Sequence, residues 1–302
     1  MKRIDYGVQI EPQYGYTYSH IRDVAQLAEL SGFESLWASD HFLIRPDAVD
    51  INCLEAWTLL AALARDTGKL RLGTLVSSQS YRNPALAAKM AATLDHISGG
   101  RIYYGVGAGW KEVEYNAYGI PFPKASTRIR QLDEALEIAE RMWIQPKASY
   151  QGKYYSVNEC VSAPKPVQSP LPIVVGGTGD RLLRVSAKHA QMVNFAWNIP
   201  LDTYRERLGV LERHCKRLGR DPDGIRKSAG LHLALEGVKG HVPAPYERYS
   251  GAKKWELKTP GEAAEIVQGY VKLGVTHFII VFPYGSEAES AAAFMKDVAP
   301  RV

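Results

Sequence analysis

The sequence has 302 residues, of which 46% are hydrophobic and 23% are charged, and its formal net charge is +5. This balance excludes an intrinsically disordered chain, and the length allows a large core without disulfide or metal staples. The lysines and arginines are scattered. Nucleic-acid surfaces need a basic stripe with interleaved aromatic side chains, so we expect no nucleic-acid partner.

The cysteines and the apolar runs indicate the cellular setting. Cys53, Cys160 and Cys215 are odd in number and form no CxxC motif, which argues against a disulfide framework and a zinc site. The sequence also lacks HExxH and His-x-His motifs, so we expect no metal. No signal-peptide core follows the N-terminus, and the apolar runs are too short to span a bilayer. We therefore expect a cytoplasmic protein without a membrane partner.

Short apolar runs alternate with helical patterns along the chain. Several runs are continuous, for example residues 72–76 and 278–282, as is typical of strands buried on both faces of a parallel sheet. The sequence predicts strands at about residues 3–10, 34–39, 70–77, 101–107, 172–176, 191–195, 229–236 and 276–282.

Helix-start signals lie between these strands. Asn83 followed by Pro84 predicts a helix over residues 84–98. Capping boxes and capping side chains predict further helix starts at Asp202, Thr259 and Ser286.

Repeated alternation of strand and helix at this length predicts an α/β fold, a (β/α)8 TIM-like barrel. We expect residues 1–302 to form a single domain. Polar segments with prolines and tyrosines interrupt the alternation at about residues 144–171 and 238–258, and we interpret them as insertions.

Asp40 and His41 come directly after the second predicted strand. Functional groups of such barrels collect at the carboxyl ends of strands, where an imidazole can act as a general acid or base. The neighbouring carboxylate can fix the tautomer of the ring. The alternative is that Asp40 caps the following loop and His41 packs against its neighbours. We predict that the two residues form a catalytic pair.

The next two strand ends carry small residues. The hydroxyls of Ser77 and Ser78 can face a ligand or belong to a loop that approaches a helix. Gly105, Gly107 and Gly109 alternate, which leaves one face of the strand without side chains. A flat ring could lie against that backbone; tight packing inside the barrel is the alternative.

A glycine-rich turn follows the fifth predicted strand at residues 176–179 and leads into a helix. Free amides at a helix N-terminus bind anions, and Arg181 and Arg184 can add charged contacts. A turn that needs glycine only for its geometry is the alternative.

Motifs follow one another in a fixed order over most of the chain. They are Trp37-x-x-Asp40-His41, residues 72–74, 81–84, 94–101 and 105–110, Glu114 with residues 118–123, and residues 152–155, 164–166 and 176–179. Together they resemble the luciferase-like monooxygenase superfamily, most closely its coenzyme F420-dependent oxidoreductases.

The resemblance implies a bacterial luciferase-like TIM-like barrel with insertions. It also implies a flavin-type ring at the strand ends, from coenzyme F420 or alternatively FMN. Asp40 and His41 would lie near its reactive face, and a non-prolyl cis peptide bond would fall near Leu75-Val76. Residues 177–181 would hold the phosphate. The full set of cofactor-binding positions implied is Leu75, Val76, Ser77, Gly107, Ala108, Gly109, Trp110, Gly176, Gly177, Thr178, Gly179 and Arg181.

We therefore predict hydride transfer between F420 and a small organic substrate, with His41 as proton donor or acceptor assisted by Asp40. An FMN-dependent monooxygenase that uses reduced flavin and oxygen, a non-catalytic flavin-binding barrel and an unrelated barrel enzyme stay open. The resemblance also implies a homodimer and a reductase that supplies reduced cofactor. The candidate walls of the substrate pocket are Gln9, Glu11, Asn194, Trp197, Phe282 and Tyr284.

Overall fold

The strands of the computed structural model, which describes residues 3–240, 242–250 and 255–302, close into a parallel barrel. Along the sheet the order is β3, β2, β1, β13, β10, β9, β8, β5 and β4, and a further pairing between β3 and β5 completes the ring. The strands are β1 (Asp5–Ile10), β2 (Ser35–Ala38), β3 (Arg71–Thr74), β4 (Ser77–Ser78), β5 (Ile102–Gly107), β8 (Ile173–Gly176), β9 (Met192–Trp197), β10 (Arg226–His232) and β13 (Val275–Val281).

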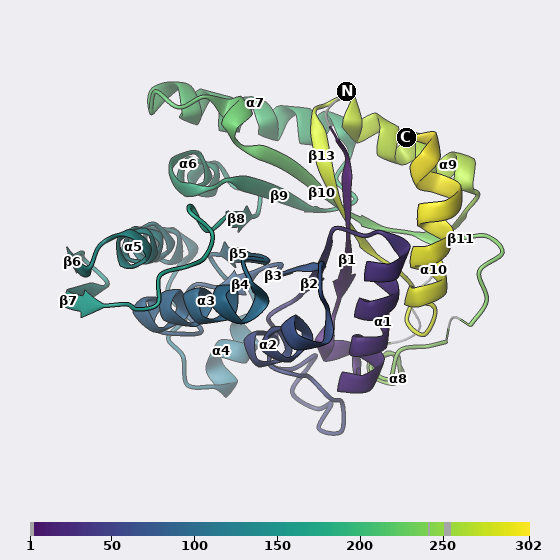
Figure 1. Cartoon of the computed structure of the whole chain (residues 1–302), viewed down its shortest axis with the longest axis horizontal. Helices are drawn as coiled ribbons and strands as arrows, with labels where there is room; N and C mark the ends of the chain where they lie inside the picture. The colour runs from purple at the N-terminus through teal and green to yellow at the C-terminus, as the bar shows by residue number, and fades with distance from the viewer. Residues whose placement is uncertain (1–2, 241, 251–254) are drawn as a thin grey trace.

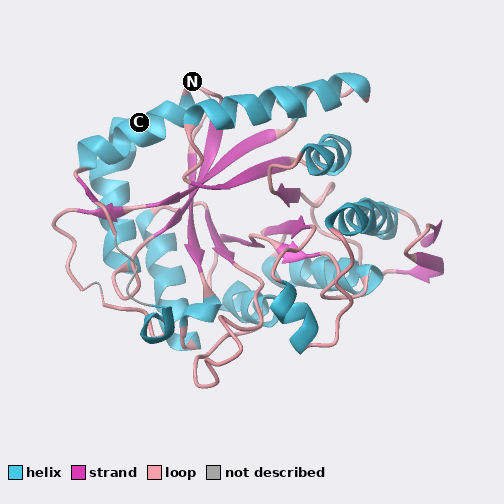
Figure 2. Ribbon diagram, turned by 180° about the vertical axis from the view of Figure 1, so that it is seen from behind, coloured by secondary structure: helices cyan, strands magenta, loops and turns pink. Residues whose placement is uncertain are grey.

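Helices surround the strands in both ribbon views (Figures 1 and 2). The main helices are α1 (Tyr18–Ser31), α2 (Ala56–Asp66), α3 (Pro84–Ser98), α5 (Ala125–Ile144), α6 (Asp180–His189), α7 (Leu201–Arg217), α9 (Pro260–Val271) and α10 (Glu287–Ala293). Shorter helical segments are η1 (Pro12–Tyr14), α4 (Glu112–Ala117), η2 (Pro222–Gly224), α8 (Glu247–Ser250), η3 (Phe294–Val298) and η4 (Ala299–Arg301). The predicted (β/α)8 barrel is confirmed.

Alternation along the strands divides the core into two layers. In β13, Phe278 and Ile280 pack outward against the helices, whereas Ile279 belongs to a separate cluster inside the barrel. That inner cluster is built around Trp37 and Tyr103, whose rings stack with centroids 5.0 Å apart. These aromatic rings fill the barrel interior, so open space remains only toward its ends.

Two predicted strands have different bounds. The run 70–77 is divided into β3 and β4, because the chain leaves the strand at Leu75-Val76, whose peptide bond is cis. The run 229–236 is also divided. After β10 the chain turns away from the barrel, and β11 (Ala234–Leu235) pairs with β12 (Leu257–Lys258) in a separate sheet. Neither interruption was predicted, because the sequence is largely apolar across both of them.

The helix caps agree with the sequence in two cases and differ in two. Asn83 accepts from the amides of Ala85 and Leu86, and Thr259 forms the predicted capping box. The prediction for Asp202 is wrong, because the N-cap residue of α7 is Pro200, two residues earlier. Ser286 precedes α10, but its hydroxyl donates to the carbonyl of Pro283 and caps no helical amide.

The two predicted insertions carry secondary structure of their own. Residues 144–171 contain an antiparallel hairpin of β6 (Lys147–Gln151) and β7 (Ser156–Val161). Within the described part of residues 238–258 lie α8 and β12. Among the helices of the described residues, none combines the length and the apolar character needed to cross a lipid bilayer.

Candidate active site

The barrel opens at the carboxyl ends of its strands into a cavity of about 750 Å³. The carboxyl ends of seven strands, or the loops that follow them, contribute to its wall. This end is where the chemistry of such a fold is usually found. The lining includes Glu11, Gln13, Tyr14, Asp40, His41, Leu75, Val76, Ser78, Gly107, Ala108, Gly109, Trp110, Lys111, Gly176, Gly177, Asn194, Trp197 and His232.

His41 lies in this wall and is held by a carboxylate. Its Nδ1 is 2.9 Å and 3.1 Å from the two carboxylate oxygens of Glu114, which is fully buried. On the other side, the ring meets Trp110 edge-on, with centroids 5.7 Å apart. Because an ionised carboxylate can only accept, Nδ1 must be the donor, and Nε2 is left as the nitrogen available to the cavity.

Glu114 is kept ionised by its neighbours. Its carboxylate accepts from the amides of Phe42 and Leu43 and from the hydroxyl of Tyr81, and Lys111 Nζ lies 3.2 Å away. Burial opposes ionisation, but the hydrogen bonds and the positive charges around the group win and lower the pKa of Glu114 to about 2. At neutral pH the imidazole therefore faces a buried anion.

Asp40 does not serve His41 in the way that we predicted. Its carboxylate is buried and receives both NH1 and NH2 of Arg82, at 2.6 Å and 3.1 Å. Arg82 also donates to Glu55, and together these anions raise the pKa of Arg82 against the opposing effect of burial. The expected pair between Asp40 and His41 is replaced by two separate pairs, because the guanidinium offers Asp40 a bidentate partner.

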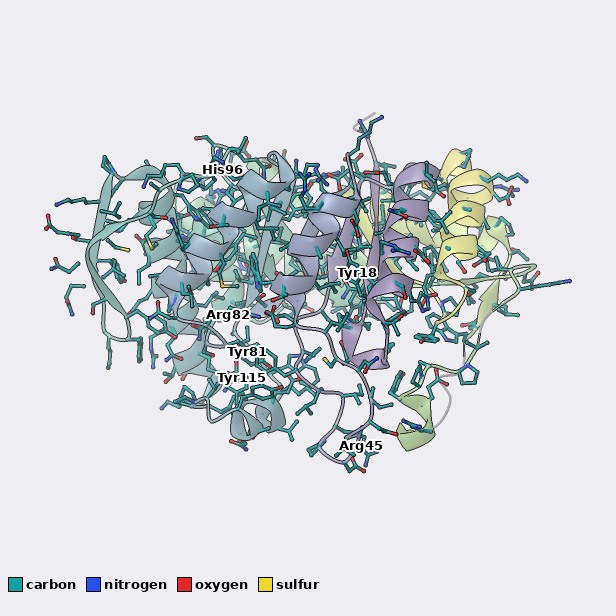
Figure 3. The ribbon with its side chains drawn as sticks, turned by 60° about the horizontal axis from the view of Figure 1, so that its bottom comes forward. Tyr18, Arg45, Tyr81, Arg82, His96 and Tyr115 are labelled. Atoms are coloured by element: carbon teal, nitrogen blue, oxygen red, sulfur yellow. The ribbon has the colours of Figure 1, made fainter. Side chains whose placement is uncertain are left out.

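The residues that support these two pairs come from neighbouring loops. Figure 3 shows Tyr81, Arg82 and Tyr115 close together, and the rings of Tyr81 and Tyr115 lie 4.9 Å apart. Tyr81 and Arg82 enter just before α3, whereas Tyr115 belongs to α4 beside Glu114. In the sequence, Glu114 and Arg82 stand out only as parts of motifs, and no role was predicted for either residue.

One wall of the cavity consists largely of main chain. Val76 follows the cis peptide bond, at the position that the resemblance implied, and fits beneath two glycines. A Cβ atom at Gly107 would lie 2.8 Å from Val76 Cγ2, and one at Gly176 would lie 3.0 Å from both of its methyl groups. Side chains at these two positions would displace Val76, so the flat, backbone-lined wall requires glycine.

Two of the predicted small residues are packing positions. A Cβ atom at Gly105 would lie 1.7 Å from the carbonyl oxygen of Thr74, so this glycine permits strand packing and not ligand approach. Ser77 lies outside the cavity lining, and its hydroxyl accepts a hydrogen bond of 2.9 Å from the indole of Trp57. Ser78 takes the place in the lining that we expected for Ser77.

The predicted phosphate turn lies at the edge of the cavity. Gly176 and Gly177 line the cavity, and Gly179 is the N-cap residue of α6. Thr178 is partly exposed and Arg181 is exposed, outside the lining. The first amides of α6 have no intrahelical acceptor, which is the arrangement that binds anions. Phosphate binding by residues 177–181 stays a prediction.

The rest of the wall comes from the ends of β1, β9 and β10. Glu11, Asn194 and Trp197 line the cavity as expected, with Gln13, Tyr14 and His232 in addition. The prediction for Phe282 is wrong, because this side chain is buried in the outer core between barrel and helices. Tyr284 instead packs against Tyr16 and His20. Gln9 is buried beneath Glu11, to which its amide donates.

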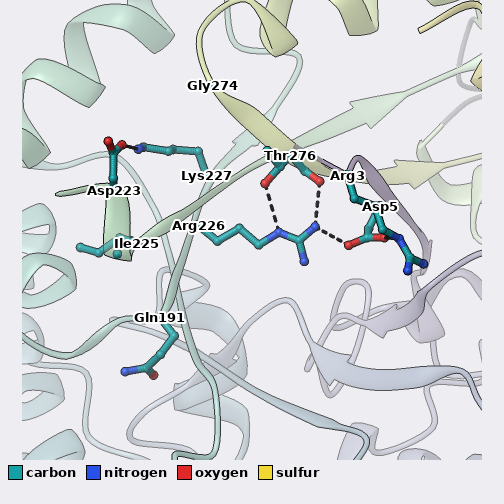
Figure 4. Close-up of a pocket in the computed structure, with 10 residues that line it drawn as sticks. Arg3, Asp5, Gln191, Asp223, Ile225, Arg226, Lys227, Gly274 and Thr276 are labelled. Carbon is teal, nitrogen blue, oxygen red and sulfur yellow. Dashed lines mark hydrogen bonds and ion pairs between the residues drawn. The ribbon is translucent and has the colours of Figure 1, made fainter. Parts of the chain in front are cut away.

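The other end of the barrel carries a smaller hollow of about 380 Å³. Figure 4 shows that its charged groups pair with one another: Arg226 donates to Thr276 and to Asp5, and Lys227 lies 2.9 Å from Asp223. Arg3 also pairs with Asp5. The charged groups of this hollow are engaged with one another, so the chemistry is assigned to the end that contains His41.

Comparison with known proteins gives a consistent relationship. The family model described as luciferase-like monooxygenase matches residues 4–297. An Intrasporangium calvum protein named F420-dependent glucose-6-phosphate dehydrogenase is 30% identical over 308 residues, covering 90% of this chain and 91% of the relative. A Pseudomonas putida protein named FMNH(2)-dependent dimethylsulfone monooxygenase is 34% identical over 176 residues, covering 58% of this chain and 48% of the relative.

Solved structures share the fold. An F420-dependent secondary alcohol dehydrogenase, solved with an F420-acetone adduct, superimposes with a TM-score of 0.85 at 18% identity, over 99% of each chain. A coenzyme F420-dependent tetrahydromethanopterin reductase from Methanopyrus kandleri gives a TM-score of 0.79 at 20% identity, also over 99% of each chain.

Proposed function

The chain belongs to the luciferase-like monooxygenase family and is an oxidoreductase of that family; from this premise we propose that it transfers a hydride between coenzyme F420 and a small organic substrate. The observation that carries the proposal is His41, held through Nδ1 by the buried Glu114 in the wall of a 750 Å³ cavity. The cofactor part is supported by the Intrasporangium calvum relative, whose similarity extends over nearly the whole chain.

The residues present fit a flat ring. Gly107, Gly109, Gly176 and Gly177 expose main chain along one wall, and Val76 supplies an apolar surface behind it. Leu75 and Ala108 extend this wall, and α6 begins at its edge with free amides for a phosphate. When bound, deazaflavin would supply the hydride chemistry, and the protein would supply orientation and exclusion of water.

His41 and Glu114 would carry out the proton transfer. With Nδ1 committed to Glu114, His41 can accept a proton from a substrate hydroxyl at Nε2, or return one to a carbonyl oxygen in the reverse direction. The nearby anion stabilises the imidazolium formed when His41 accepts a proton, as a carboxylate does for a catalytic histidine in other enzymes. Asp40 binds Arg82 and makes no direct contribution to the proton transfer at His41.

An FMN-dependent monooxygenase is the second candidate, because the Pseudomonas putida relative matches about half of the chain. A non-catalytic flavin-binding barrel is less well supported, since a pure binder has no use for the His41–Glu114 pair. A homodimer, a partner reductase and a cytoplasmic location stay predictions.

Titration of the purified chain with F420 and with FMN, each oxidised and reduced, tests the cofactor. We expect saturable binding of F420, followed by fluorescence, and much weaker binding of FMN. Preference for reduced FMN would move the protein to the oxygen-using branch. Binding of neither would refute the site.

Substitution of the histidine tests the proton role. We expect His41→Ala to lower kcat by about 100-fold to 10,000-fold, since general acid–base catalysis typically contributes that much. Cofactor affinity should be retained, and His96→Ala on the exposed face of α3 is the matched control. Full turnover in His41→Ala with cofactor bound would exclude this role.

A further inference from the structure

We propose that His189 is a pH-sensitive clamp between α5 and α6: as an imidazolium it donates from both ring nitrogens to carboxylates of α5, and loss of one proton at alkaline pH releases α6. The clamp lies outside the active-site cavity and does not depend on the reaction proposed above. It acts on the helix that begins at the glycine turn, so it links pH to the edge of the cavity.

Two carboxylates of α5, which lies beside α6 (Figure 1), hold the imidazole of His189. Nδ1 is 2.9 Å from Glu140 Oε2, and Nε2 is 2.9 Å from Asp133 Oδ1. An ionised carboxylate can only accept, so both contacts are hydrogen bonds only when both ring nitrogens carry a proton. In the neutral ring one nitrogen is bare, and its lone pair would face a carboxylate oxygen. The His189 side chain is only 1% exposed, which makes this unfavourable arrangement costly.

Other charged groups share Asp133 but leave Glu140 to the histidine. Lys188 Nζ lies 3.0 Å from Asp133 and 2.7 Å from Glu137, and Arg184 lies 3.9 Å from Asp133. Further titratable groups on the elements around α6 are Arg141 of α5, Tyr150 of β6, His214 and Cys215 of α7, Arg220 after α7, and Asp180 at the start of α6. In the described part of the chain, His189 is the only cation paired with Glu140.

The protonation of the clamp has a defined pH range. Burial disfavours the charged form of His189, but the hydrogen bonds to Asp133 and Glu140 outweigh burial and raise the pKa of His189 above 6.5. The clamp is therefore complete below pH 6.5 and is lost as the pH rises through this raised pKa. On the acid side, the hydrogen bond from His189 lowers the pKa of Asp133 to about 2, so Asp133 stays charged across the range in which the ring is protonated.

Release of the clamp acts on α6 as a unit. The helix has 10 residues and spans about 15 Å, with His189 in its last turn and Gly179 as its N-cap at the edge of the cavity. His189 therefore touches no ligand and acts only through the helix. Leu183 and Val185 stay packed in the core, so we expect α6 to open locally while the barrel stays folded.

Nitrogen-15 NMR of the histidine rings tests the protonation state, on the full chain without cofactor. The signals of His189 are identified by their absence in His189→Gln. We expect both ring nitrogens to carry protons below a titration midpoint that lies above pH 6.5. Asp133→Asn and Glu140→Gln should each move the midpoint to lower pH, because each removes one anion. A midpoint at or below 6.5, or one that neither variant moves, would overturn the proposal.

Hydrogen exchange of the α6 amides, corrected for the intrinsic effect of pH, tests release of the helix. Between pH 6.5 and about pH 9 we expect the opening equilibrium constant of α6 to rise by about tenfold or more, the size of one lost charge-assisted hydrogen bond, while the amides of β1 stay protected. In His189→Gln, α6 should already be open to this extent at pH 6.5 and should not respond to pH.

His96→Gln on the exposed face of α3 is the matched control and should behave as the unaltered chain does. Should His189→Gln fail to fold, Glu140→Gln keeps the histidine and should release α6 at a lower pH than the unaltered chain. Opening of α6 that does not change with pH, or a full pH response in His189→Gln, would refute the clamp. None of these measurements needs cofactor or substrate, so their outcome is separate from that of the proposed function.

Discussion

The two ends of the barrel are both hollowed and both charged, yet only one of them is equipped for chemistry. At the N-terminal end, Arg226, Asp5 and Thr276 bind one another, and the hollow measures about 380 Å³. At the C-terminal end, the imidazole of His41 has one nitrogen fixed by Glu114 and the other left for a cavity of about 750 Å³. Charged groups that pair with one another contribute to the stability of the fold. A reactive site, in contrast, needs a positioned group that can still bind or exchange a proton with a substrate.

After His41→Ala itself, the largest expected effect concerns the carboxylate of Glu114 that holds the histidine. Glu114→Gln removes the charge that orients His41, and we expect kcat to fall by about 100-fold while cofactor affinity is kept. Glu114→Asp should recover part of the rate, and Glu206→Gln is the matched surface control. An unchanged kcat in Glu114→Gln would break the contrast between the two ends.

Glu114→Gln should also change the free energy of unfolding and its dependence on pH. The pKa of Glu114 is lowered from 4.5 to about 2, so its stabilising contribution is complete above pH 4.5 and is lost as the pH falls toward 2. Glu114→Gln should lower the free energy of unfolding at neutral pH by roughly 3 kcal/mol, because Lys111 loses its buried partner. Denaturant unfolding of the two proteins should converge on acidification.

The backbone-lined wall gives a smaller effect. Gly107→Ala would place a Cβ atom 2.8 Å from Val76 Cγ2, which forces Val76 toward the cavity. We expect cofactor affinity to fall by about tenfold, since overpacking of this kind costs about 1–3 kcal/mol. Gly68→Ala is the control, because a Cβ atom there meets nothing within 4 Å. Equal affinity in both variants would show that the wall does not carry the ring.

The smallest expected effect concerns the stability contributed by His277, which lies toward the N-terminal end of the barrel. His277 is fully buried between β1 and β10, with Nε2 3.0 Å from the hydroxyl of Ser35. Burial, with the charges of Arg226 and Arg71, lowers its pKa well below 6.5. Stability is therefore complete above pH 6.5 and should decline by up to about 1.4 kcal/mol per pH unit below it.

His277→Gln should flatten this decline in thermal unfolding between pH 6.5 and 5, the interval just below the ordinary histidine pKa of about 6.5. His96→Gln, on the exposed face of α3, should not alter it. Turnover at neutral pH should be the same in both variants, because the N-terminal end takes no part in the reaction. A loss of turnover in His277→Gln would contradict the separation of the two ends.

Local patterns in the sequence determined the architecture and part of the site. Strand periodicity, the caps at Asn83 and Thr259 and the regular alternation of elements specify the barrel, because each depends on residues within one element. The rule that functional groups follow strand ends located His41, and the glycines at 107 and 176 marked the wall that faces the cavity.

Tertiary structure alone decided which charged groups pair. Glu114 reaches His41 across 73 residues, and Arg82 takes Asp40 across 42 residues, although Asp40 and His41 are adjacent in sequence. These partners come from loops, whose course is fixed by packing around the barrel and leaves no periodic signal. The candidate histidine could therefore be identified from the sequence, whereas its carboxylate partner is determined by the tertiary structure.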